Sequence, residues 1–211
     1  MNPTEKLQLI LSKHLPEKSI PYCLDLWVKN GFNFTVTPAR KTKLGDFRWR
    51  RDSKRQTITI NGTLNPYQFL ITYIHEVAHL HTYLHFGIET APHGKEWKST
   101  FQQLMIPLLK PEIFPKDILI PLSRHMRNPK ASSAGDLFLT KELSKYDLNH
   151  HVSEEVFLAD LKPGLWFELQ GRKFQKKETR RTRVLCEEIP SGKKFLISQL
   201  AKIKPLESSG L

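Results

Sequence analysis

The feature that most constrains the fold is the stretch from residue 67 to 86, which contains no glycine or proline and is apolar on all sides of a helix. Such a stretch is typical of a buried helix. It contains His75 and His79, which are four positions apart and therefore lie on one face of that helix. Burying imidazoles without partners is costly, and binding a shared cation removes that cost. The pattern therefore predicts a metal site on a buried helix.

Two further residues extend this site. Glu76 lies about 100° around the helix from His75, where its carboxylate can reach a water on the metal rather than the metal itself. Gly87 predicts the end of the helix, and the loop after it lets His93 return toward the first two histidines as the best candidate for a third ligand. Zinc with three protein ligands keeps an open position for water, whose pKa it lowers to about 7. The predicted hydrolytic site consists of His75, His79 and His93 as ligands of one catalytic Zn²⁺ and Glu76 as general base.

Other titratable residues nearby leave one alternative open. Glu89 or Glu96 can replace His93 as the third ligand, as in zinc hydrolases that use a glutamate. His81 and His85 lie on other sides of the helix from the ligand pair, so they cannot join the same metal. We expect these two histidines to be core or boundary residues.

The sequence resembles the SprT-like metallopeptidases, which include bacterial SprT and the eukaryotic protease Spartan. The resemblance rests on these stretches, in chain order: Arg40, Leu44-Gly45, the strand 57–61, HEVAHL at 75–80 and HGKEW at 93–97. It implies an α+β, zincin-like domain over residues 1–123, built from a small sheet and the active-site helix. It also implies that the three histidines bind zinc, that Glu76 is the base of an endopeptidase, and that proteins on DNA are cleaved, because Spartan-like members degrade proteins crosslinked to DNA.

The charge of the chain also favours a nucleic-acid partner. The formal net charge is +12, which attracts polyanions. Arg48, Arg50 and Arg51 belong to a basic cluster before the active helix and are predicted to lead DNA toward the cleft. A second cluster on a predicted hairpin is expected to face phosphates, and it comprises Arg172, Lys173, Lys176, Lys177, Arg180, Arg181 and Arg183. The alternative for this second cluster is a solvated hairpin whose lysines block edge pairing.

The chain is predicted to contain two folding units. Residues 124–156 are rich in Asn, Pro, Ser and Gly and suggest a linker with at most a short helix near 137–143. Residues 157–211 hold five short strand patterns and predict a small β-barrel. Bacterial SprT proteins usually carry a cysteine-rich zinc ribbon at this end, which Cys23 and Cys186 cannot form. We therefore expect the basic barrel to bind DNA in place of the ribbon.

These patterns lead to one interpretation and two rivals. The chain is interpreted as a zinc endopeptidase that acts on DNA-associated or DNA-crosslinked proteins. The rivals are a zinc-containing DNA-binding scaffold that does not cleave, and a general peptidase whose charge serves solubility alone. No apolar run approaches the ~18 residues needed to span a bilayer, so we expect no membrane partner and a cytoplasmic location. We also expect residues 56–61 to form the sheet edge that binds an extended substrate.

Overall fold

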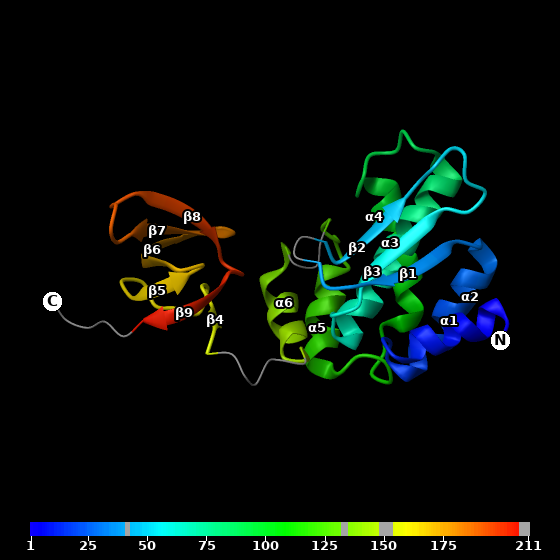
Figure 1. The fold of residues 1–211 in the computed structure, drawn as a ribbon, viewed down its shortest axis with the longest axis horizontal. Helices are drawn as coiled ribbons and strands as arrows, with labels where there is room; N and C mark the ends of the chain where they lie inside the picture. The colour runs from blue at the N-terminus through cyan, green and yellow to red at the C-terminus, as the bar shows by residue number, and fades with distance from the viewer. Residues whose placement is uncertain (41–42, 132–134, 148–153, 207–211) are drawn as a thin grey trace. The chain divides into compact units, whose positions relative to one another are not determined.

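The computed structural model describes residues 1–40, 43–131, 135–147 and 154–206, which belong to two compact units, Met1–Leu148 and Asn149–Leu211 (Figure 1). Each unit has a hydrophobic core of its own. The chain is mixed α+β, with a three-stranded sheet in the first unit and a separate antiparallel sheet in the second. Within the described ranges, no helix is both long and apolar enough to cross a membrane.

The first unit combines a small three-stranded sheet with helices. The elements, in chain order, are α1 (Pro3–Ser12), α2 (Ile20–Asn30), β1 (Asn33–Thr37), β2 (Gly45–Arg48), β3 (Thr57–Asn61), α3 (Pro66–Phe86), α4 (Lys95–Met105), α5 (Lys116–His125) and α6 (Leu137–Ser144). The long helix α3 is buried on most of its surface, as its apolar sequence predicts. It begins at Asn65, whose side chain accepts a hydrogen bond from the Gln68 amide, and it ends at Gly87, which has a φ of 79°.

The order of the strands corrects the prediction for residues 56–61. The sheet order is β1-β3-β2, with β1 parallel and β2 antiparallel to β3. The predicted edge strand β3 is therefore the central strand, and the prediction was wrong. Strands on both sides satisfy the backbone of β3, and four of its five residues are buried. The short strand β2 is only partly buried. The edge that adjoins α3 is β2.

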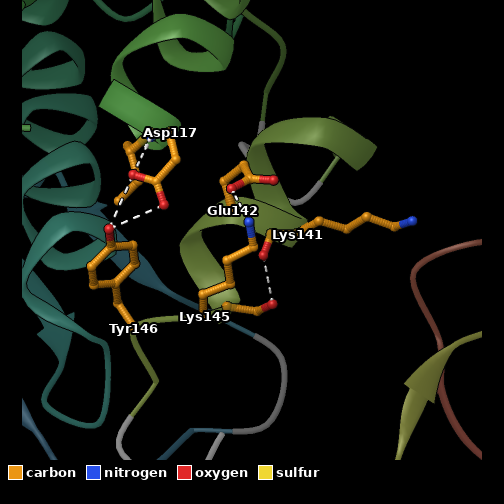
Figure 2. Close-up of polar contacts among 7 residues, drawn as sticks. Asp117, Lys141, Glu142, Lys145 and Tyr146 are labelled. Atoms are coloured by element: carbon orange, nitrogen blue, oxygen red, sulfur yellow. Dashed lines mark hydrogen bonds and ion pairs between the residues drawn. The ribbon is translucent and has the colours of Figure 1, made fainter. Parts of the chain in front are cut away.

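Helices α5 and α6 extend the first unit to Leu148, beyond residue 123, where the sequence placed the end of the domain. The short helix expected near 137–143 is α6. Its end is tied to the start of α3, because the Asn65 amide donates to the Leu143 carbonyl (2.9 Å) and to Asp147 (2.8 Å). Tyr146 bonds to both carboxylate oxygens of Asp117 on α5, at 3.0 and 3.1 Å (Figure 2). Residues 132–134 and 148–153 of the predicted linker lie outside the described residues.

The second unit is an antiparallel sheet in the order β4-β9-β5-β6-β7-β8. Its strands are β4 (Val156–Phe157), β5 (Trp166–Leu169), β6 (Arg172–Arg180), β7 (Arg183–Glu188), β8 (Lys194–Ser198) and β9 (Lys202–Leu206). The five predicted strands correspond to β5 through β9. The terminal strands β4 and β8 are not paired with each other in the described part of the chain, so the predicted barrel is not closed. Closure needs a ladder between the outer strands, and β4 has only two residues.

Candidate metal centre and basic surfaces

The three predicted histidine ligands converge. The Nε2 atom of His79 lies 3.1 Å from that of His75 and 3.0 Å from that of His93, and the third separation is 3.2 Å. Among the residues that the structure describes, this is the group of His, Cys, Asp or Glu side chains that can hold a metal ion. Neither Glu89 nor Glu96 belongs to it. His93 is therefore the third member of the cluster.

A strained turn directs His93 toward α3. His93 has a φ of 58°, a left-handed conformation that residues other than glycine seldom adopt. The next residue, Gly94, closes the turn by donating its amide to the Ala91 carbonyl at 2.9 Å. A Cβ on Gly94 would lie 2.9 Å from that carbonyl oxygen, so the turn needs glycine there. Trp97 on α4 lies beneath the cluster and packs against all three imidazole rings, with centroids 4.6 to 5.4 Å apart.

The protonation states and spacing of the cluster fit a cation. Burial lowers the pKa of His75 to about 2 and that of His79 to about 4, and it also lowers the pKa of His93. All three rings are therefore neutral at pH 7, with lone pairs available for a metal. A tetrahedral zinc with Zn–N bonds of about 2.0–2.1 Å places its nitrogens roughly 3.3 to 3.4 Å apart. The observed separations are close to that value, so this donor set fits zinc.

Glu76 is held beside the cluster by strand β2. It is buried, and the backbone amide of Phe47 donates a hydrogen bond to its carboxylate. The backbone of Gly45 lies so close that an added Cβ would be 2.6 Å from Glu76 Oε1 and 2.7 Å from Thr72 Cγ2. Glycine is thus required for β2 to approach the helix. The Phe47 ring stacks on the His79 ring, with centroids 6.4 Å apart, so this strand contacts both the predicted base and a ligand.

The electrostatic environment of Glu76 depends on what the histidines hold. Burial raises its pKa to about 8, and Asp46 adds to the shift, while the Phe47 amide, Arg40 and Lys43 oppose it. A cation on the neighbouring histidines favours the carboxylate and lowers this pKa. A bound cation would therefore favour the ionised, proton-accepting form of Glu76.

The cluster opens into a pocket of about 540 Å³. Three cations, Arg40, Lys43 and Lys130, line it together with the carboxylates of Asp46 and Glu76, and Lys43 is ion-paired with Asp46 at 2.7 Å. His125 on α5 lines it as well, and its Nδ1 lies 3.2 Å from Asp136 Oδ2. No spacing rule links His125 to the helix of His75. Asp136 could have been found as a helix cap, because it directly precedes an apolar run.

The predicted DNA-contacting residues of the first unit are exposed but do not line this pocket. Arg48 is the last residue of β2, and its Nε bonds to Asp46 at 2.6 Å. Arg50 and Arg51 lie between β2 and β3 and are exposed. Two other basic residues of the same stretch, Arg40 and Lys43, do line the pocket, together with Lys130.

The predicted basic hairpin of the second unit is divided by the alternation of strand β6. Lys176 points inward and is only 2% exposed. Its Nζ donates to the carbonyls of residues 158, 159 and 161, at 2.8, 3.2 and 2.6 Å. Arg172 bonds to Glu188 at 2.7 Å and lies over the rings of Phe174 and Phe195. The remaining side chains are exposed or half-buried, and they are Lys173, Lys177, Arg180, Arg181 and Arg183.

Lys176 therefore differs from the rest of the predicted set, since its ammonium group donates hydrogen bonds to backbone carbonyls inside the unit. The turn between β6 and β7 carries the more accessible cations. Gln199 supports this turn by donating to the carbonyls of Arg180 and Arg181, at 3.0 and 3.1 Å. Arg181 has no ion pair among the described side chains, and Arg183 bonds to the Leu196 carbonyl at 3.3 Å.

The fold and the site together define a class of protein: an α+β domain in which a buried helix and the loop after it bring together three histidines that can hold a metal ion, beside a glutamate. A comparison with protein-family models makes this specific, since residues 23–113 match the SprT-like family. This part of the chain belongs to that family, which indicates a metalloprotease-type domain. The match includes His75, Glu76, His79 and His93 and ends before α5. Neither a curated protein nor a solved structure matches the chain.

Proposed function

We propose that the chain is a zinc-dependent endopeptidase that cleaves proteins bound or crosslinked to DNA. The observation that carries this proposal is the convergence of three neutral imidazoles beside the buried Glu76, in a pocket that Arg40, Lys43, Asp46 and Lys130 also line. A purely structural zinc is usually closed by four protein ligands and has no need of an adjacent carboxylate. The family match over residues 23–113 supports the same reaction class.

The residues of the chain divide the chemistry between them. His75, His79 and His93 would hold the zinc, which acidifies a water and polarises the scissile carbonyl when it is bound. Glu76, fixed by the Phe47 amide, accepts a proton from the attacking water. It then delivers that proton to the amine nitrogen that is released when the peptide C–N bond breaks. A single carboxylate thus acts first as base and then as acid.

We infer that the substrate binds as an extended strand along β2 rather than along β3. The backbone of β2 touches Glu76 at Gly45 and Phe47, so a peptide beside this strand passes next to the base. Backbone pairing of this kind gives affinity with little dependence on side chains. Mapping of cleavage sites should therefore show broad tolerance, and one strictly required residue at a fixed position would contradict this inference.

The DNA part of the proposal rests on the exposed cations. In the second unit these are Lys173, Lys177, Arg180, Arg181 and Arg183, with Lys176 excluded because it is buried. Lysine and arginine on a hairpin contact phosphates rather than base edges, so binding should depend little on DNA sequence. Arg40, Lys43 and Lys130 outnumber the carboxylates of Asp46 and Glu76 in the lining of the pocket, which favours substrates that are held near a polyanion.

The test is cleavage of a protein covalently crosslinked to DNA, beside a free peptide, by the wild-type chain and by Glu76→Gln. The wild type should bind about one zinc and cleave the crosslinked protein faster than the free peptide. Glu76→Gln should keep its zinc but lose about 10²- to 10⁴-fold in cleavage rate, because the general base is gone. Zinc binding without cleavage of either substrate would support the scaffold alternative. Equal rates on both substrates would indicate a general peptidase.

A further inference from the structure

The pocket contains a further histidine that is not one of the three clustered imidazoles. His125 is the last residue of α5 and is 4% exposed, yet it lines the same pocket as the metal ligands. Its Nδ1 faces Asp136 Oδ2 at 3.2 Å. Both residues lie beyond residues 23–113, the range that the SprT-like family matches. This pair of side chains therefore needs an explanation of its own.

Asp136 is positioned by the helix that it caps. Its Oδ1 accepts a hydrogen bond from the Leu139 amide at the start of α6, while Oδ2 faces His125. The other end of α6 is anchored by Asn65, and Tyr146 just beyond it bonds to Asp117 on α5 (Figure 2). Both ends of α6 are thus anchored, and the helix holds the Asp136 carboxylate in place. Its orientation toward His125 is set by the fold.

The second nitrogen of His125 faces the pocket. Within the described residues, Nε2 has no hydrogen-bond partner. The fully enclosed side-chain nitrogens without a partner belong to Arg40, His81 and Trp97, and His125 Nε2 is not one of them. An atom with neither a partner nor complete enclosure is open to the pocket that the ring lines. Nε2 is therefore free to bind whatever enters.

The carboxylate determines which kind of bond Nε2 can make. Burial lowers the pKa of His125, with Asp136 opposing the shift, so the ring is neutral at pH 7. An ionised carboxylate only accepts hydrogen bonds, so Nδ1 must carry the ring proton. Nε2 is then an acceptor. A peptide extended along β2 directs alternate main-chain N–H groups away from that strand, and these groups need acceptors elsewhere in the pocket.

We propose that His125 is a substrate-binding residue whose Nε2 accepts a hydrogen bond from a main-chain N–H of the bound peptide. Asp136 is its positioning residue, because it fixes the proton on Nδ1. This inference rests on the proposed peptidase function. If the pair were merely structural, it would only join α5 to α6. Peptide affinity would then not depend on which ring nitrogen of His125 carries the proton.

Asp136→Asn separates the two roles. Asparagine caps helices as well as aspartate does, so α6 should persist. With its oxygen on the Leu139 amide, its NH₂ group faces His125 Nδ1 and moves the ring proton to Nε2. Nε2 would then oppose the peptide N–H as a second donor. The KM for peptide should rise about 5- to 150-fold, with kcat within about threefold and with zinc content and thermal midpoint unchanged.

A binding measurement and a spectroscopic measurement complete the test. In the Glu76→Gln background, Asp136→Asn should raise the Kd of an uncleaved peptide by the same factor as the KM, and Asp136→Ser, which also caps, should raise it less. Nitrogen-15 NMR of the metal-free protein should show His125 protonated at Nδ1 in the wild type and at Nε2 in Asp136→Asn.

The failures of this inference and of the proposed function are distinguishable. A wild-type His125 protonated at Nε2 would overturn the inference alone. Peptide affinity unchanged in Asp136→Asn, or a loss confined to kcat, would also overturn it while the peptidase activity stands. A wild-type protein that neither binds nor cleaves peptide would overturn the proposed function and this inference with it, whatever the NMR shows.

Discussion

The candidate metal centre and the β6–β7 hairpin both contain side chains that lie close together in the sequence. The fold brings the first group to one place and separates the members of the second. On α3, residues four apart share a face, so His75 and His79 converge and His93 joins them from the next loop. On β6, neighbouring residues point to opposite faces, so the basic residues of this strand are divided between the two faces. Lys176 lies in the interior while Lys173 and Lys177 do not. A cluster in sequence becomes a site only where the local period brings its members to one face.

The two regions also differ in the partners that satisfy their buried polar groups. The ammonium of Lys176 is satisfied by three backbone carbonyls of the same unit, so its role is structural. The Nε2 atoms of the three histidines have only one another as partners among the described residues, which leaves them for an external cation. The partners of Lys176 thus indicate a structural group, whereas the convergence of the three histidines indicates a binding group.

The largest expected effect tests how closely β2 must approach the metal centre. In Gly45→Ala the new Cβ would lie 2.6 Å from Glu76 Oε1, so β2 or the carboxylate must move. A displacement of about 1 Å can lower a catalytic rate by about 100-fold, and we expect a loss of that order in peptide cleavage. Zinc content should stay near one per chain, because the histidines are untouched. Cleavage at the wild-type rate would show that the site tolerates movement of this strand.

An intermediate effect tests the structural role of Lys176. Lys176→Met leaves the carbonyls of residues 158, 159 and 161 without this donor, which should destabilise the second unit by about 1–3 kcal/mol. Lys173→Met, on the exposed side of the same strand, is the matched control and should change stability by less than about 0.5 kcal/mol. Hydrogen exchange of residues 158–161 measures the difference within the full chain. Equal protection in both variants would contradict the assignment of Lys176 to the interior.

The smallest effect concerns phosphate contacts at the β6–β7 turn. Arg181→Ala should lower the slope of log affinity against log salt by about 0.9 if the residue neutralises one duplex phosphate. Arg172→Ala is the control, because this guanidinium is bonded to Glu188 and lies over Phe174 and Phe195. It should leave the slope unchanged. DNA binding would be assigned to the first unit if the slope is unchanged in Arg181→Ala but falls in a variant that alters Arg48, Arg50 and Arg51.

Much of the fold followed from local patterns. The predicted helix over residues 67–86 is α3, the strand patterns of the second unit correspond to β5 through β9, and the short helix near 137–143 is α6. Each of these elements is specified by residues within a few positions of one another, through apolar periodicity, caps and turn residues. The four-residue spacing of His75 and His79 on α3 is likewise a short-range feature of the sequence.

The sequence by itself determined the elements and the chemistry of their side chains, because both depend on short-range spacing. Only the tertiary structure decided that β2 rather than β3 is the sheet edge beside α3, that the second sheet stays open, and that Lys176 is buried. It also brought His125 and Asp136 to the pocket of His75, from segments with no periodic relation to it. Strand order and cavity lining arise from contacts between residues far apart in the chain, and no local period encodes such contacts.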